Sequence, residues 1–247
     1  MKIRLFYGVT AAVLAFTVSP AVAADINFRA PISQNGFESL TKEAGAALGY
    51  RNMAPAEPLG VTGFDIGFEV SAMSIDEKSE YWRSAFGNDA PAYLVVPKIR
   101  VRKGLPLGID VGAMYSYVPD SNVKLFGAEL SKAILEGGVA APAIGVRATY
   151  TKMTGVDDLG LQTYGIDASI SKGFLILTPY AGVGMLWIKS EPKGHLQTQL
   201  IRLSDVSTTV PRYFGGVKIT PFPLFSVTAE AEYAEQPVYS LKVAFNF

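Results

Sequence analysis

The chain has 247 residues, and its 22 lysines and arginines balance 22 aspartates and glutamates, so the formal net charge is zero. This balance gives no electrostatic basis for a nucleic-acid partner. The absence of cysteine excludes disulfides, thiolate chemistry and any metal site built on thiolates. No Pro/Ser-rich linker divides the chain, so its length fits one large all-β domain better than two small ones.

The N-terminus has the pattern of a cleavable secretory signal peptide over residues 1–24. Lys2 and Arg4 precede an uncharged stretch, and small residues at Ala23 and Ala24 end it. The apolar part is short for a membrane-spanning helix, and a retained N-terminal anchor is the alternative. We therefore predict an exported protein.

Residues 25–62 differ from the rest of the chain and are predicted to form a lid or plug segment that is periplasmic or lumenal. Apolar residues recur near helical spacing at Phe37, Leu40, Ala44, Ala47 and Leu48. Ser33 or Asn35 is a candidate N-cap, and Pro55 and Pro58 end any helix that precedes them.

Apolar and polar side chains alternate almost throughout residues 63–247, which is typical of strands with one apolar face. Ten segments have strand length, from GFDIGFEVSA to VYSLKVAFNF. The connections are alternately short Gly/Pro turns and longer polar loops, a pattern typical of outer-membrane barrels with the long loops outside the cell. We predict an all-β, antiparallel, up-and-down transmembrane barrel of ten strands. Counting AALGYRN and INFRAP as strands would give twelve.

The last strand carries alternating apolar residues up to a terminal aromatic residue: Tyr239, Leu241, Val243, Phe245 and Phe247. This ending resembles that of Gram-negative outer-membrane β-barrel proteins, in which it is the signal read by the barrel-assembly machinery. The resemblance implies localisation to the cell outer membrane, with lipid, lipopolysaccharide and that machinery as partners. The Ala/Gly-rich stretch before the first strand is weakly similar to the N-terminal hatch of the long-chain fatty-acid transporter family, but the Asn-Pro-Ala triplet of that family is absent.

The same alternation predicts which charged side chains line the lumen. They are Asp65, Glu69, Lys98, Arg100, Arg102, Asp110, Glu129, Arg147, Asp167, Lys218, Glu230, Glu232 and Lys242. Acids and bases are nearly balanced and largely alternate between neighbouring strands, so we expect pairs such as Glu69 with Arg100. This favours a narrow, charge-paired lumen serving envelope structure or surface interaction. A selectivity filter in a channel or transporter for small molecules, including hydrophobic ones, is the alternative.

The sequence has few side chains in patterns suited to catalysis. We therefore predict no enzyme, catalytic residue, cofactor or metal site. His195 is the single histidine, and a general base needs a fixed partner within reach. The pair Asp157 and Asp158 is interpreted as turn chemistry rather than a Ca²⁺ or lipopolysaccharide contact. Trp82 and Phe86 fall on one face of a short helix, and we expect them to pack over the barrel mouth.

Overall fold

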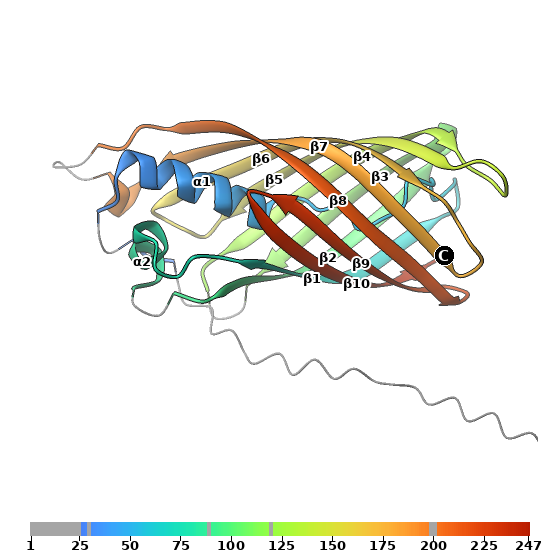
Figure 1. The fold of residues 1–247 in the computed structure, drawn as a ribbon, viewed down its shortest axis with the longest axis horizontal. Helices are drawn as coiled ribbons and strands as arrows, with labels where there is room; N and C mark the ends of the chain where they lie inside the picture. Colours follow the sequence, from blue (N-terminus) through green and yellow to red (C-terminus); the bar gives the residue numbers. More distant parts are fainter. Residues whose placement is uncertain (1–25, 29–30, 88–89, 119–120, 198–201) are drawn as a thin grey trace, which may run out of the picture.

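The computed structural model describes residues 26–28, 31–87, 90–118, 121–197 and 202–247, so the predicted signal peptide lies outside the described residues. Ten antiparallel strands form one closed barrel in which neighbours in sequence pair and β10 pairs with β1 (Figure 1). They are β1 (Phe64–Ser74), β2 (Tyr93–Leu105), β3 (Ile109–Tyr117), β4 (Lys124–Glu136), β5 (Ala143–Thr154), β6 (Leu159–Ser171), β7 (Leu177–Pro192), β8 (Val206–Phe222), β9 (Phe225–Ala234) and β10 (Gln236–Asn246). The prediction of ten strands is confirmed.

The alternative of twelve strands is wrong, because most of the residues it needed take other conformations. In the first extra segment, Ala46–Leu48 belong to helix α1 (Gln34–Leu48) and the residues after it form no strand. The described part of INFRAP is not a strand either. Small, unbranched side chains and the N-cap at Ser33, whose hydroxyl accepts a hydrogen bond from the Gly36 amide at 3.0 Å, favour the helix.

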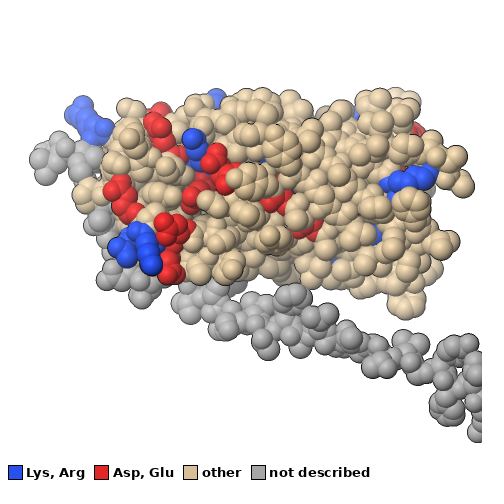
Figure 2. All heavy atoms as spheres, viewed as in Figure 1, with Lys and Arg blue, Asp and Glu red and all other residues tan. Residues whose placement is uncertain are grey.

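Side chains alternate between the two faces of the barrel wall as the period of two requires. In β1, Asp65 and Glu69 are buried, whereas Phe64, Ile66 and Phe68 are 40–52% exposed on the outside. The middle of the outer face in Figure 2 is accordingly mostly uncharged, with charged side chains gathered mainly near the end that holds α1. The barrel is thus apolar outside and charged inside.

The two ends of the barrel differ. At one, the turn end, short turns join β2 to β3, β4 to β5, β6 to β7 and β8 to β9, and Phe247 pairs with Phe64. At the other, the loop end, the β1–β2 connection contains α2 (Glu80–Phe86) and the β7–β8 connection is long. Figure 1 places α1 and α2 together at the loop end, opposite the C-terminus.

Residues 31–62, here called the inner segment, run through the barrel from one end to the other, and residues at both ends of the segment are exposed. Ser33 contacts Glu80 of α2 at the loop end, and the Leu59 amide donates to Asp110 beside the β2–β3 turn at the turn end. The described N-terminal residues therefore lie at the loop end, opposite the short turns. Among the described residues, no helix is long and apolar enough to span a bilayer.

The interior has two zones. Near the loop end an apolar core surrounds α1, with Phe37 and Leu40 packed among Trp82, Leu186 and Val210 from α2, β7 and β8. In the middle of the barrel charged side chains replace this core, and the irregular part of the inner segment runs between them. The helix is held mainly by apolar packing and the coil that follows it by polar contacts.

Candidate functional site: the charged lumen

The structure places every charged residue predicted for the lumen on the inward face of its strand. Lys218 is half-buried and the other twelve are buried: Asp65, Glu69, Lys98, Arg100, Arg102, Asp110, Glu129, Arg147, Asp167, Glu230, Glu232 and Lys242. Among the described residues, two buried cations were missed, Arg212 on β8 and Arg51 on the inner segment. Arg212 lies an even number of residues from Lys218, so the parity of β8 could have revealed it.

Ion pairs join neighbouring strands around the seam where the barrel closes. Glu69 of β1 accepts from Lys98 at 3.0 Å and forms an ion pair with Arg100 at 2.9 Å, both on β2. Lys242 of β10 contacts Asp65 of β1 at 3.1 Å. The predicted pair of Glu69 with Arg100 is present, and opposite charges join the last strand to the first.

A second chain of ion pairs crosses β2 to β8. Arg102 contacts Asp110 at 3.0 Å and also pairs with Glu129. Arg147 lies between Glu129 and Asp167, and Asp167 is shared with Arg212. Because each carboxylate in this chain has a cation beside it, the desolvation cost of burial is offset by pairing.

Three arginines of the wall also hold the main chain of the inner segment. Arg100 donates to the carbonyls of Arg51 at 3.0 Å and Asn52 at 2.8 Å. Arg147 donates to the Arg51 carbonyl, and Arg212 to the Tyr50 carbonyl, each at 2.8 Å. We call these three arginines the carbonyl cradle. They come from β2, β5 and β8, so the segment is pinned from several sides of the barrel.

Donor groups of the inner segment also bind carboxylates of the barrel wall. Arg51 pairs with Glu232 and donates to the carbonyls of Ala46 and Ala47 at the end of α1. The Met53 amide donates to Glu230 at 2.9 Å.

Glu230 also accepts from the Tyr180 hydroxyl at 2.8 Å. In the described part of the chain, Glu230 forms no ion pair within 4 Å, unlike Glu232 beside it.

Glycines in the wall leave room for the inner segment. A Cβ on Gly104 would lie 1.9 Å from the carbonyl oxygen of Gly60, and one on Gly127 would lie 2.8 Å from the ring of Tyr50. The main chain of the segment therefore packs directly against β2 near the turn end. The lumen is filled by polypeptide at these levels.

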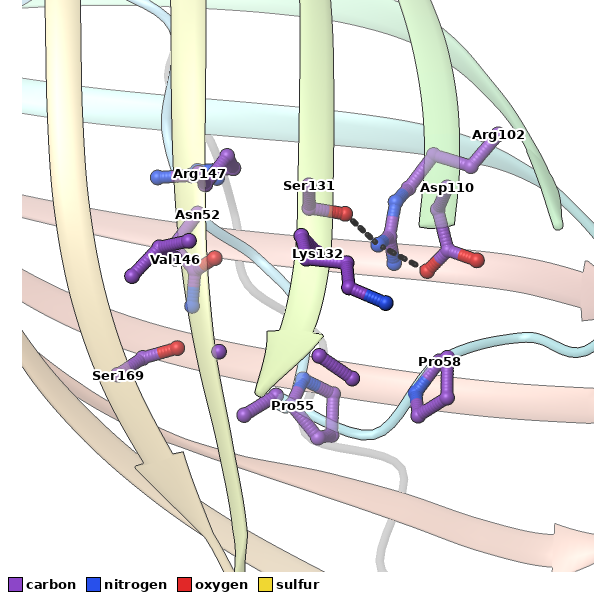
Figure 3. A pocket seen from close by; sticks show the side chains of 13 residues that line it. Asn52, Pro55, Pro58, Arg102, Asp110, Ser131, Lys132, Val146, Arg147 and Ser169 are labelled. Atoms are coloured by element: carbon purple, nitrogen blue, oxygen red, sulfur yellow. Dashed lines mark hydrogen bonds and ion pairs between the residues drawn. The ribbon is translucent and has the colours of Figure 1, made fainter. Parts of the chain in front are cut away.

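A pocket lies between the inner segment and strands β2–β6 (Figure 3). Asn52, Pro55 and Pro58 face Arg102 and Asp110 across it, and Arg102 contacts Asp110. The cavity volume is about 20 Å³, which has room for ordered water, because one water needs roughly 10–15 Å³.

The loop end holds His195, whose ring nitrogen lies 3.1 Å from the carboxylate of Asp158. Neither of its neighbours in sequence, Glu191 and Asp205, is this partner. The imidazole is 79% exposed, and Asp158 also accepts from the amide of Phe28 at 3.2 Å. The contact ties loops together, and no cluster of three or more metal-ligating side chains exists among the described residues.

Carboxylates tie α1 to α2 at the barrel mouth. Glu80 accepts from the hydroxyl of Ser33 at 2.7 Å and from its amide at 3.1 Å, and these hydrogen bonds lower the pKa of Glu80.

Glu43 of α1 accepts from Tyr81 at 3.0 Å and from the indole of Trp82 at 2.7 Å. Burial, with Glu43 nearby, raises the pKa of Tyr81 to about 12. As expected, the α2 aromatic residues pack over the mouth.

No protein-family model and no curated protein matches this sequence. The solved structures that it resembles include bacterial outer-membrane β-barrels. The N-terminal barrel domain of Pseudomonas aeruginosa OprF is 12% identical, with 74% of this chain and 97% of that chain covered and a TM-score of 0.37. The Yersinia pestis outer membrane protein Ail is 13% identical, with 75% and 99% covered and a TM-score of 0.34. The translocator domain of the autotransporter NalP from Neisseria meningitidis is 10% identical, with 87% and 94% covered and a TM-score of 0.43. The likeness is one of barrel architecture.

Proposed function

We propose that this chain is an integral outer-membrane β-barrel protein, closed by its own inner segment, that serves envelope structure or surface interaction. The outward side chains in mid-barrel support a lipid environment, with Ile99, Leu130 and Val183 each more than half exposed. Charges are buried inside, the reverse of a water-soluble barrel. In hydrocarbon a closed barrel satisfies all backbone hydrogen bonds between strands.

Aromatic residues support two interfacial belts. Exposed tyrosines face outward toward the loop end at Tyr93, Tyr117, Tyr213, Tyr233 and Tyr239. Exposed phenylalanines lie toward the turn end at Phe64, Phe174, Phe222, Phe245 and Phe247. Beyond Tyr213, β8 turns polar outside at Ser207 and Thr209, as expected where a strand leaves the lipid.

This arrangement favours long loops outside the cell and short turns in the periplasm. Lipid and lipopolysaccharide are the expected partners of the wall, and the predicted signal over residues 238–247 is the expected contact for the assembly machinery. We infer no catalytic role, since the contact of His195 with Asp158 serves loop packing.

The carbonyl cradle is the observation that carries the proposed closure. Arg100, Arg147 and Arg212 fix the main chain in the middle of the lumen, where an open channel would hold water. Acidic and basic groups are balanced around it. We therefore expect low conductance with weak ion selectivity.

Single-channel recording in planar bilayers tests this function on the full chain. The wild type should conduct little, and Arg51→Ala, which loosens the inner segment, should raise the frequency of openings. Lys42→Ala, a change on the half-exposed face of α1, is the matched control and should behave like wild type. A large, steady, ion-selective conductance from the wild type would contradict closure and favour a channel for small molecules.

A further inference from the structure

The described N-terminal residues are held at the loop end by three separate connections. The Ile26 amide donates to the side chain of Asn122, between β3 and β4, at 3.2 Å, and the Asn122 amide group donates back to the Ile26 carbonyl at 3.2 Å. The Asn27 amide donates to the carbonyl of Ala85 in α2 at 3.3 Å. The Phe28 contact with Asp158 adds the β5–β6 connection.

The same segment leaves the barrel at the opposite end. The Leu59 amide contacts Asp110 at 3.0 Å, and the Gly104 amide donates to the Gly63 carbonyl at 3.0 Å. One residue later, Phe64 starts β1 and pairs with the C-terminal Phe247. The inner segment thus crosses the whole barrel once before the first strand begins.

An inner crossing followed by an even number of wall crossings puts the two described ends of the chain on opposite sides. We propose that residues 26–28 and 31–33 lie on the cell exterior beside the long loops, because the chain crosses its own lumen before the first strand begins. This inference rests on the proposed membrane location. Whether residue 27 lies on the same side of the membrane as the long loops can be tested separately from that location.

The crossing is closely packed at both ends. The helix α1 fills the mouth between α2, β7 and β8, and Gly104 leaves no clearance beside the main chain of Gly60.

Single-cysteine labelling tests the sidedness, because the native chain has no cysteine and gives no background. Three exposed positions are suited to substitution: Asn27→Cys on the N-terminal segment, Lys193→Cys in the β7–β8 connection and Val139→Cys in the β4–β5 turn. Each variant is treated with a membrane-impermeant maleimide on intact cells, on permeabilised cells and in denaturant, which gives the total.

We expect N27C and K193C to label on intact cells to the same extent, and V139C only after permeabilisation. If N27C follows V139C instead, the crossing is overturned while the membrane location stands. If K193C and V139C label alike on intact cells, the proposed location fails instead. An N27C thiol that reacts only in denaturant would also contradict the exposure on which the inference depends.

Discussion

Arg51 is the residue of the inner segment whose loss should cost most. It is fully buried, pairs with Glu232 and donates to the carbonyls of Ala46 and Ala47. In Arg51→Ala, Glu232 keeps only Arg212, 4.0 Å away. Removing one partner of a buried ion pair costs about 3–5 kcal/mol, so the free energy of unfolding should fall by this amount.

Urea unfolding in lipid vesicles, followed by tryptophan fluorescence, measures this loss. Trp82 reports on the barrel mouth, since its indole donates to Glu43 of α1. Lys42→Ala should unfold at the wild-type urea concentration, whereas Arg51→Ala should unfold earlier. Replacing the pair together by Arg51→Met and Glu232→Leu should recover most of the stability, because buried pairs tolerate apolar exchange. Equal midpoints for Arg51→Ala and Lys42→Ala would refute the pinned segment.

Three further outcomes are expected. Gly104→Ala should cost about 1–3 kcal/mol of unfolding free energy, because overpacking strains the wall. Gly215→Ala is the control and should be nearly neutral, because its added Cβ would meet its nearest atom at 3.8 Å. Equal urea midpoints for the two variants would refute the tight contact. Ile99→Arg should destabilise the barrel in vesicles by about 2–4 kcal/mol at mid-bilayer, and Ser207→Arg beyond the tyrosine belt should cost little; equal losses would contradict the lipid-facing assignment. Because the pKa of Glu80 is lowered from 4.5, its tie to α1 should persist above that value and be lost as the pH falls below it, through the folded-state pKa. Amide exchange in the first turn of α1 measures this, and Glu80→Gln should abolish the pH dependence.

The inward or outward face of each wall residue was predictable because it depends only on the alternation of neighbouring residues along the strand. A period of two fixes the face of each residue, so Asp65, Glu69 and Arg100 could be assigned inward from their neighbours alone. Arg212 was missed although it shares the inward parity of Lys218 on β8, which begins at Val206.

The contacts of the inner segment were not predictable in this way. The helix over Gln34–Leu48 showed in the spacing of its apolar residues, but the sequence left open whether this segment is lumenal or periplasmic. Arg51 and Asn52 lie in an irregular stretch without periodicity, and their partners are far away in sequence, such as Arg147 at a separation of 96 residues. Contacts of this kind depend on barrel closure, which no local pattern encodes.

The carbonyl cradle binds atoms that every residue possesses. Arg100, Arg147 and Arg212 grip oxygens of the main chain at Tyr50, Arg51 and Asn52, so this grip recognises the path of the polypeptide rather than the identity of its side chains. Side chains of the inner segment can therefore change during evolution with little effect on this hold, whereas the arginines cannot be exchanged for lysine without losing the forked geometry. In relatives of this protein we expect constancy at the three arginines and at Arg51, whose own side chain pairs with Glu232, and variation at gripped positions that lack such a pair.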